Sequence, residues 1–344
     1  MSYHGLEIDM LNLGDADSIS LTHWSAGLPT RVLIDGGEAS HYEQILEFLK
    51  GRGITYLNHI VCSHPHNDHA AGLIGIVNGI DFGQAWMHIP SHHIDLSVLR
   101  TTLSRSNATT VRETVLESLE TQQNLAQAIW NRNKTILEPF AGQKIGFLTV
   151  CGPDETFYNE QLAQFTDVNK LNILQEKLDS YRRRSHYEAF LETKGSWGAT
   201  YLVTEGVGLG EAPTGPVNES STILGVAFDN QKFLFTADAG VNALSRAKNS
   251  YNLGQLYWMQ IPHHGSRRNI NEELISLFRP KLACVSAAGT TKHPRKKVVN
   301  AFKDAHAQVF STHYPEPGGA LWFSIGVVLP RSDYGLAIPL YDAE

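Results

Sequence analysis

The sequence lacks most features that mark secreted or membrane-spanning proteins. Its 344 residues include only three cysteines, Cys62, Cys151 and Cys284, which are far apart and lack the paired spacing of a zinc ribbon. We therefore expect them to be buried thiols in a reducing compartment. There is no run of 18 apolar residues, and the first residues lack the basic start and apolar stretch of a secretory signal. These absences favour a cytoplasmic protein that makes no membrane contact.

The chain also lacks an excess of positive charge. Its formal net charge is −7, whereas proteins that hold long nucleic acids by the backbone usually present a basic face. Three short basic runs, at 182–184, 267–268 and 295–297, are each interpreted as solvated surface. The overall charge is thus a weak argument against non-specific DNA binding.

What the sequence does contain is ample apolar material, with 42% hydrophobic residues, enough for one large domain or two small ones. Short apolar strands alternate with helical stretches over residues 1–90, and strands return over residues 216–344. The intervening residues 91–215 contain, in order, a helical pattern at 109–132, a strand pair at 144–151, a second helical pattern at 159–187 and a Gly- and Pro-rich loop at 206–216.

This order predicts an α/β fold, a four-layer αββα sandwich built from two halves, 1–90 and 216–344. We expect residues 91–215 to form a mainly helical insertion outside the sandwich. The segments that carry chemistry lie on either side of that insertion, so we expect them to meet at the edge between the two sheets.

One short segment concentrates residues that bind metal ions. The apolar strand 60–62 runs directly into Ser63-His64-Pro65-His66-Asn67-Asp68-His69. Histidines two positions apart at a strand end point the same way, so His64 and His66 can share one metal ion. Asp68 and His69 follow in the turn and can supply a second. Such a dense cluster is hard to explain structurally, because buried histidines and carboxylates are costly without a cation.

Further ligands are expected from other strand ends. The apolar strand 233–236 leads to Asp238, placed to bridge two metals, and another strand is followed by His263-His264-Gly265-Ser266. Asp35 ends an earlier strand and is a candidate acceptor that orients a ligating histidine. Taken singly, Asp238 and the histidine pair could equally be structural. Their order behind the first cluster favours metal binding.

These motifs, in this order, resemble the metallo-β-lactamase superfamily. Within it, the chain is most similar to the β-lactamase-type domain of ComEC competence proteins and their soluble relatives. The subgroup likeness rests on five segments: 11–18 (Leu-Asn-Leu-Gly-Asp-Ala-Asp-Ser), 32–37 (Val-Leu-Ile-Asp-Gly-Gly), 218–221 (Asn-Glu-Ser-Ser), 293–294 (His-Pro) and 307–312. The likeness covers about residues 6–90 and 217–330, and the helical insertion has no counterpart.

The resemblance implies two divalent metal ions, zinc in the first place and manganese as the alternative. It assigns His64 and His66 to the first metal, Asp68, His69 and His264 to the second, and Asp238 to both. His264 is preferred to His263 because many members have His-x-Ser there, which leaves His263 to support a ligand or touch substrate. Many members also give the first metal a third histidine. Here Asn218-Glu219-Ser220-Ser221 takes that place, so the first position is open, looser, or completed by water or substrate.

The implied chemistry is hydrolysis by a metal-bridging hydroxide, aimed by Asp68 and Asp238. The leading hypothesis is a phosphodiesterase or nuclease acting on a nucleic acid or small phosphodiester. Arginine can grip phosphate with two hydrogen bonds, and four basic residues lie close in sequence to the site: Arg267, Arg268, Lys292 and Arg295. The alternatives are a lactonase, thioesterase or β-lactamase, or a partner-controlled effector subunit that docks a protein through the helical insertion.

The remaining candidates concern the substrate. We expect His263, Asn218, Ser221 and Arg267 to contact it. His293 follows the strand 282–286 and is expected at the mouth of the site, as a general acid or phosphate donor; the alternative is a surface histidine beside a proline. A further group follows an earlier strand and could line the pocket, but is interpreted as loop or packing residues: His88, His92 and His93.

Overall fold

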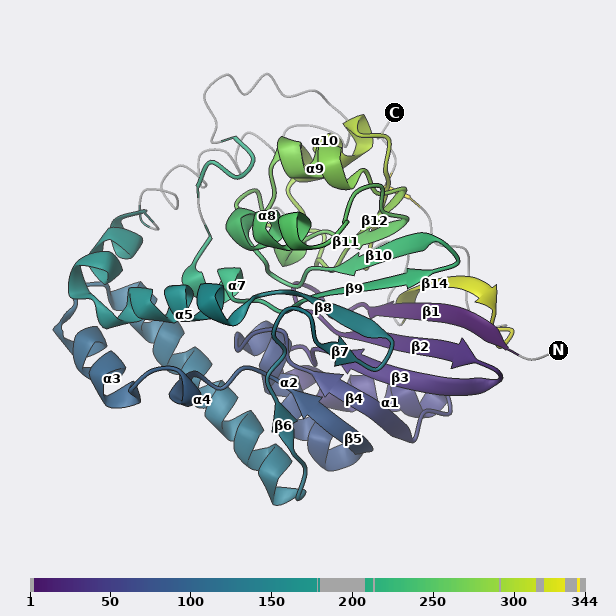
Figure 1. Cartoon of the computed structure of the whole chain (residues 1–344), viewed down its shortest axis with the longest axis horizontal. Helices are drawn as coiled ribbons and strands as arrows, with labels where there is room; N and C mark the ends of the chain where they lie inside the picture. The colour runs from purple at the N-terminus through teal and green to yellow at the C-terminus, as the bar shows by residue number, and fades with distance from the viewer. Residues whose placement is uncertain are drawn as a thin grey trace.

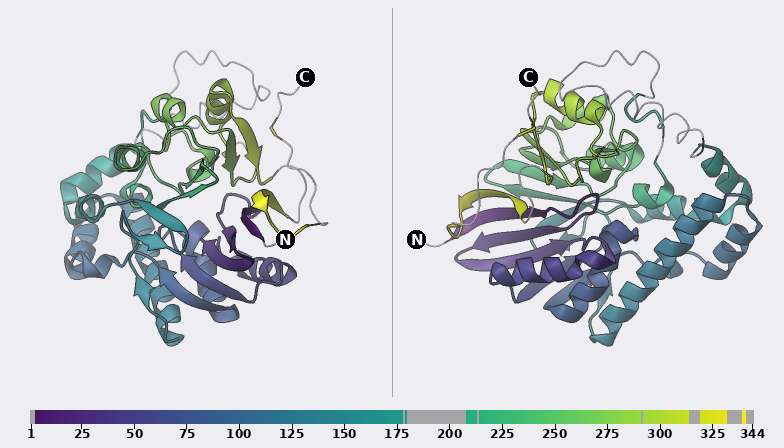
Figure 2. Two further views of the ribbon diagram at one scale, coloured as in Figure 1. Left: turned by 45° about the vertical axis from the view of Figure 1, so that its right-hand side comes forward. Right: turned by 180° about the vertical axis from the view of Figure 1, so that it is seen from behind.

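Two seven-stranded sheets lie face to face in the computed structural model, and helices cover the outer face of each (Figures 1 and 2). The predicted α/β sandwich is therefore confirmed. The structure describes residues 3–177, 179, 208–212, 214–290, 292–313, 319–331 and 339–340. The basic run at 182–184, the end of the helical pattern at 159–187 and part of the loop at 206–216 lie outside the described residues.

The first sheet has the strand order β14-β1-β2-β3-β4-β5-β6. Its strands are β1 (His4–Leu11), β2 (Ile19–Ser25), β3 (Leu28–Ile34), β4 (Tyr56–Val61), β5 (Asp81–Trp86), β6 (Ile136–Leu137) and β14 (Ala320–Val327). Strands β14, β1, β2 and β3 pair antiparallel, whereas β3 to β6 are parallel. The parallel strands bring the loops that follow them to one edge of the sheet.

The second sheet has the order β13-β12-β11-β10-β9-β8-β7. Its strands are β7 (Lys144–Ile145), β8 (Leu148–Gly152), β9 (Ile223–Phe228), β10 (Gln231–Phe235), β11 (Trp258–Gln260), β12 (Leu282–Val285) and β13 (Gln308–Ser311). Here β7 to β10 are antiparallel and β10 to β13 parallel. Aromatic side chains fill the space between the sheets, including Phe235 and Trp258, whose ring centroids lie 5.0 Å apart.

The outer layers are amphipathic helices that bury one face against a sheet. In α1, for example, Ile45 and Leu49 lie one turn apart and are fully buried. The first sheet is covered by α1 (Tyr42–Gly51), α2 (Asn67–Gly79) and the C-terminal half of α4 (Thr109–Asn131), and the second by α8 (Val241–Ser250), α9 (Glu272–Phe278) and α10 (Lys296–Asp304).

A third group of helices lies at one end of the sandwich, on the left in Figure 1. It consists of α3 (Leu96–Arg105), the N-terminal half of α4, α5 (Glu155–Ala163), the 3-10 turn η3 (Gln164–Thr166) and a helical stretch at 168–177. These helices share a small apolar core of their own, which includes Leu99, Leu119 and Phe165.

Residues 91–215 do not all lie outside the sandwich, which corrects the expected layout. Strand β6 extends the first sheet beside β5, and β7 and β8 extend the second beside β9. The C-terminal half of α4 also packs on the first sheet, where Leu125 and Ile129 join the apolar core. The chain is helical between residues 96 and 131, but it then returns to complete one edge of each sheet.

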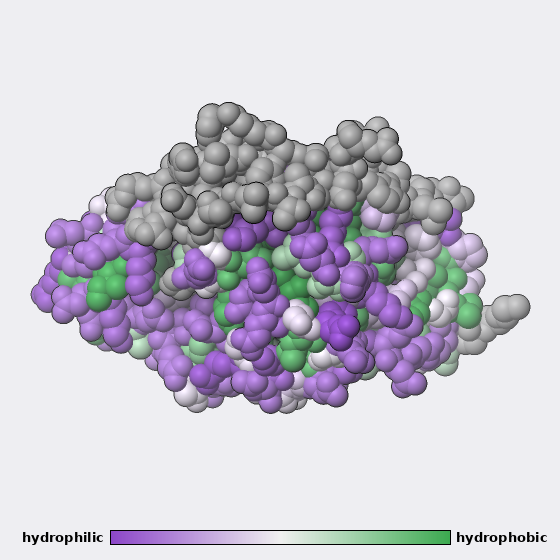
Figure 3. Space-filling model, turned by 90° about the horizontal axis from the view of Figure 1, so that it is seen from above, coloured by the Kyte–Doolittle hydropathy of each residue, from purple (hydrophilic) through white to green (hydrophobic). Residues whose placement is uncertain are grey.

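The three cysteines are buried and unpaired, as expected. Among the described residues, no helix has both the length and the apolar composition needed to cross a membrane. The face seen in Figure 3 is mainly hydrophilic where it is described, with small separate hydrophobic patches. Exposed large apolar side chains such as Leu28, Val98 and Trp130 come from different elements.

The packing of α2 predicts a clear loss of stability when its core face is shortened. Leu73→Ala removes a fully buried side chain, so we expect the free energy of unfolding to fall by about 2–5 kcal/mol. The matched change Leu277→Ala, at a side chain that is 37% exposed, should cost less than about 1 kcal/mol. Urea unfolding followed by circular dichroism measures both. Equal losses would contradict the packing described for α2.

Candidate metal centre

The predicted ligand residues meet at one edge of the sandwich, because the parallel strands of both sheets end there. In the first sheet, Asp35 follows β3 and the histidine segment follows β4. In the second sheet, Asp238 follows β10, His263 and His264 follow β11 in the 3-10 turn η4 (His263–Gly265), and His293 lies in the loop after β12. Each sheet therefore contributes part of the site.

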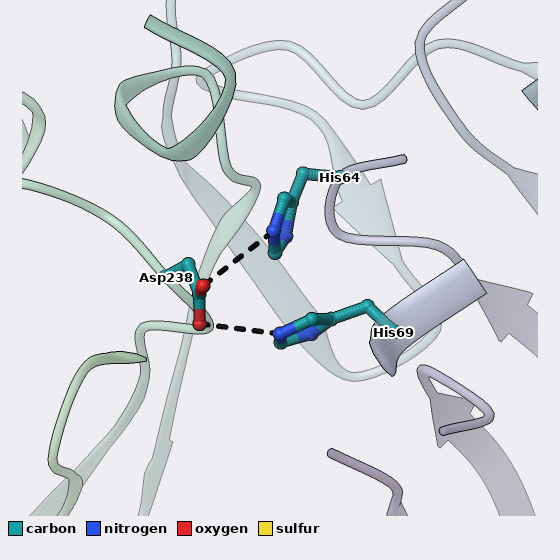
Figure 4. A group of neighbouring side chains, drawn as sticks. All are labelled: His64, His69 and Asp238. Atoms are coloured by element: carbon teal, nitrogen blue, oxygen red, sulfur yellow. Dashed lines mark ion pairs between the residues drawn. The ribbon is translucent and has the colours of Figure 1, made fainter. Parts of the chain in front are cut away.

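Asp238 lies between two histidines that come from the opposite sheet (Figure 4). Its Oδ2 is 3.6 Å from His64 Nε2, and its Oδ1 is 3.2 Å from His69 Nε2. All three side chains are buried, and their donor atoms lie within 4.8 Å of one another. These three residues could hold one metal ion.

A second group shares His69 with the first. His264 Nε2 is 3.2 Å from Asp68 Oδ2, and His69 Nε2 is 4.0 Å from the same oxygen. The donor atoms of Asp68, His69 and His264 again lie within 4.8 Å of one another. This is the set that the resemblance assigns to the second metal, and the structure brings all three together.

His66 lies beside His64 but outside both groups. It precedes α2 as the N-cap residue, and its Nδ1 is 3.1 Å from His64 Nε2. Its own Nε2 is buried and makes no hydrogen bond to any described residue. Two ring nitrogens this close need a proton or a cation between them, since otherwise two lone pairs face each other.

Asp35 fixes the orientation of two of these histidines. It accepts hydrogen bonds from His69 Nδ1 (2.8 Å), from the Ser63 amide (2.7 Å) and from the Ser63 hydroxyl (2.6 Å). Because the Ser63 proton goes to Asp35, its oxygen is free to accept from His64 Nδ1, which is 3.1 Å away. Both imidazoles then present an Nε2 lone pair to the site, the arrangement a metal ligand needs.

His264 is fixed in the same sense by a different partner. Its Nδ1 donates to the carbonyl oxygen of Ser286 (3.0 Å), which leaves Nε2 facing Asp68. The turn that carries it is tight: His263 and His264 both have positive φ, at 49° and 53°. This left-handed backbone is uncommon outside glycine, and it places the two rings nearly perpendicular, with an interplanar angle of 83°.

The electrostatics favour positive charge in this space. Burial disfavours a charged imidazole, but the carboxylates of Asp238, Asp68 and Asp35 outweigh it and raise the pKa of His69. Burial likewise opposes the charge of His264, yet its hydrogen bond with Asp68 raises its pKa to about 9. Although burial acts the other way, the neighbouring histidines lower the pKa of both Asp68 and Asp238. The carboxylates therefore stay ionised and attract cations.

Two aspartates that the sequence analysis gave no role also lie here. Asp17 is buried, accepts from Gln260 Nε2 (2.9 Å), and has Oδ2 at 3.8 Å from His69 Nδ1. Burial raises the pKa of Asp17. Asp15 Oδ2 is 3.3 Å from His293 Nδ1. The signal that could have found them is the segment 11–18, which was used for the resemblance alone.

The candidate substrate residues are placed at different depths. His263 Nε2 is 3.6 Å from Asp238 Oδ2, and its Nδ1 lies 2.9 Å from Asn218 Nδ2. The His293 ring lies 5.6 Å from that of His264 and 5.8 Å from that of His263, so it borders the metal groups. The other two candidates are buried: Ser221 is 0% and Arg267 is 3% exposed.

The sequence of the first half carries the family signal. Residues 30–139 match the family model described as the metallo-beta-lactamase superfamily, and the two-sheet fold agrees with it. This stretch of the chain is therefore similar to that superfamily. No curated protein matches it.

Solved structures with a similar course of the chain are distant in sequence. Tm1679, a metal-dependent hydrolase of the beta-lactamase superfamily, has 13% identity over 94% of this chain and 98% of that chain, with a TM-score of 0.44. The hydrolase AbOPH has 11% identity over 96% and 99%, with a TM-score of 0.40. A diphosphatase from the PhnP family has 11% identity over 94% and 99%, with a TM-score of 0.37.

The contacts of Asp35 lead to a prediction about metal affinity. Asp35→Asn removes the negative charge that orients His69 and, through Ser63, His64. We expect the affinity for zinc to fall about 10–100-fold, as is usual when a partner behind a ligand is lost. Competition with a chromophoric chelator measures it, with the exposed Glu38→Gln as the control. Unchanged affinity in Asp35→Asn would show that its hydrogen bonds do not position the ligands.

Proposed function

We propose that the protein is a hydrolase that uses two divalent metal ions. The observation that carries the proposal is the overlap of two ligand groups in one buried space, with His69 in both. The donor set fits metal ions on its own chemistry: the Nε2 atoms of His64, His69 and His264 converge with carboxylate oxygens of Asp68 and Asp238. Two of these buried atoms, His69 Nε2 and Asp238 Oδ1, have no hydrogen-bond partner among the described residues.

The mixture of imidazole and carboxylate ligands suits zinc and also accepts manganese. The resemblance assigns His64, His66 and Asp238 to the first ion and Asp68, His69, His264 and Asp238 to the second. The donor atoms that converge at the first position are those of His64, His69 and Asp238, with His66 beside them. Bound there, such ions supply Lewis acidity and make hydroxide available near neutral pH. The protein's own contribution is to orient the ligands, through Asp35 and the Ser286 carbonyl, and to keep the carboxylates ionised.

Side-chain nucleophiles next to the cluster are poorly suited to attack. The Ser63 hydroxyl donates a hydrogen bond to Asp35, which holds it in place. The Cys62 thiol points to the carbonyl oxygen of His64 at 3.3 Å, and burial raises the pKa of Cys62 well above its ordinary value. A thiol must be deprotonated to attack efficiently. Both residues are better explained as parts of the support of the histidine segment.

For the bond that is cleaved we propose a phosphodiester. Two arginines close to the His264 turn support an anionic substrate: Arg267 lies three residues after His264 in the chain, and the backbone of Arg295 adjoins the turn, where its amide donates to the carbonyl of Gly265 (3.1 Å). His263 and His293 border the same space and can donate a proton or a hydrogen bond to a phosphate oxygen. Lactone, thioester and β-lactam hydrolysis are the competing reactions in the assays that follow.

The metal assignment predicts the outcome of removing one ligand. Purified protein should carry up to two zinc or manganese ions per chain. Asp68→Ala should lose metal from one position and at least about 100-fold in turnover of bis-p-nitrophenyl phosphate, while the fold is retained because Asp68 lies in the first turn of α2 and is partly exposed.

Elemental analysis and steady-state kinetics measure the two effects of Asp68→Ala. The control is Asp81→Ala, at an exposed aspartate whose ion pairs with Lys134 and Arg132 lie on the surface. Near-normal turnover by Asp68→Ala with both metals bound would contradict the assignment. Turnover of nitrocefin or a thioester, but of no diester, would redirect the substrate class.

The position of His293 predicts a dependence on the leaving group. If His293 protonates the departing oxygen, His293→Ala should slow a diester with a poor, alkoxide leaving group by about 10²–10⁴-fold. A diester that releases p-nitrophenolate needs less protonation and should be slowed much less. Equal losses would assign His293 to phosphate binding. No loss beyond that of His306→Ala, at an exposed histidine, would make it structural.

A further inference from the structure

A cavity of about 50 Å³ adjoins the metal centre, between the sandwich and the helices at its end. One side of it is formed by Ser63, His64 and Pro65, which belong to the ligand segment. The opposite side comes from α3, α4 and α5, with Leu99, Leu119 and Tyr158 among its lining residues. Because one water molecule needs about 10–15 Å³ of such space, the cavity has room for several heavy atoms.

Among the described residues, none that lines the cavity is charged. Its apolar members are buried parts of the helical core: Leu99 is 1%, Val115 5% and Phe165 3% exposed. Most polar side chains that line it already have partners within the protein: Ser118 Oγ donates to Thr114 O (2.7 Å), Ser220 Oγ to Val217 O (2.7 Å), and Gln122 Nε2 to His88 O. An occupant must therefore be uncharged and largely apolar.

His88 is a polar lining residue whose side chain lacks such a partner. It is only 8% exposed, yet neither of its ring nitrogens has a hydrogen-bond partner among the described residues. The ring stacks on Tyr158 with centroids 4.3 Å apart, which holds its orientation. Burial lowers the pKa of His88 to about 3, so the ring is neutral. A neutral imidazole offers one donor and one acceptor, so His88 is a buried, unpartnered polar group beside a largely apolar wall.

We propose that this cavity binds an uncharged substituent of the substrate, about the size of an aromatic ring and bearing a polar atom for His88. The inference rests on the proposed function, because His64 belongs both to the cavity wall and to the ligand group that faces Asp238. A substituent in the cavity therefore lies next to the bond at the metals. The substrate class that follows is a small phosphodiester with one uncharged, largely apolar group, rather than a long nucleic acid.

The first experiment measures binding without catalysis. The probe is phenol, an uncharged ring with one polar atom, titrated into the metal-loaded protein by calorimetry. Leu99→Trp fills the cavity from α3, and the matched control Val98→Trp adds the same side chain at a neighbouring position that is 49% exposed. We expect phenol to bind the native protein and Val98→Trp equally, and Leu99→Trp at least tenfold more weakly, a typical size for loss of a shaped apolar pocket.

A second variant covers the case in which Leu99→Trp does not fold. His88→Phe keeps a ring that can stack on Tyr158 but removes both nitrogens, so phenol should bind at least about tenfold more weakly. Absence of phenol binding to the native protein would overturn the proposal. Equal binding to the native protein and to either cavity variant would overturn it as well.

The catalytic experiment compares two diesters that both release p-nitrophenolate. One is 4-hydroxyphenyl p-nitrophenyl phosphate, and the other is methyl p-nitrophenyl phosphate. The native protein should prefer the aromatic diester in kcat/KM by at least about tenfold, and Leu99→Trp should abolish that preference while Val98→Trp keeps it. Equal kcat/KM values in the native protein would contradict the cavity proposal alone. Phenol binding without turnover of either diester would contradict the proposed function alone.

Discussion

The candidate metal centre depends on a single buried imidazole surrounded by carboxylates. His69 lies 2.8 Å from Asp35, 3.2 Å from Asp238, 3.8 Å from Asp17 and 4.0 Å from Asp68. Three of these four carboxylates are almost completely buried. Burying several like charges together is costly unless positive charge balances them. His69 and His264 together supply at most two positive charges, fewer than the negative charges that the surrounding carboxylates can carry, so the arrangement makes physical sense with cations in the space that His69 shares with its neighbours.

The fold creates this concentration of charge through its parallel strands. β3 and β4 in one sheet, and β10, β11 and β12 in the other, all deliver their following loops to one edge. Backbone hydrogen bonds tie the loops to each other: the Thr222 amide donates to Ser63 O (2.9 Å), and the Asp17 amide donates to Asp68 O (3.0 Å). The ligands are thus held by the packing of the whole sandwich.

The sequence alone was sufficient to identify candidate ligands whose residue type and immediate neighbours indicate metal binding. The dense histidine segment, and Asp238 at a strand end, could be recognised from residue type and spacing. Asp17 could not be recognised in this way, because its place beside His69 depends on the loop after β1 folding across to Gln260, 243 residues away in the chain.

Short edge strands such as β6 could not be predicted for a related reason. Two residues are too few to show a periodicity, and their pairing is decided by the neighbouring strand. His88 shows the same limit, since only the packing of Tyr158 and α4 reveals its buried, unpartnered ring.

The segment that replaces the expected third histidine would make the two proposed metal positions unequal. Its one charged residue, Glu219, turns away from the site and accepts from the Ala243 amide (2.8 Å) at the start of α8. Asn218 contacts His263 instead of the ligand groups.

The first position is therefore left with His64, His66 and the shared Asp238, whereas the second has Asp68, His69 and His264 as well as Asp238. Fewer protein ligands mean weaker retention and a more open coordination sphere, so we infer that the second position fills first and that the first is the one at which substrate oxygen binds. His64, which would belong to that first position, also lines the cavity beside His88, so a substituent bound in the cavity would lie next to the more open position.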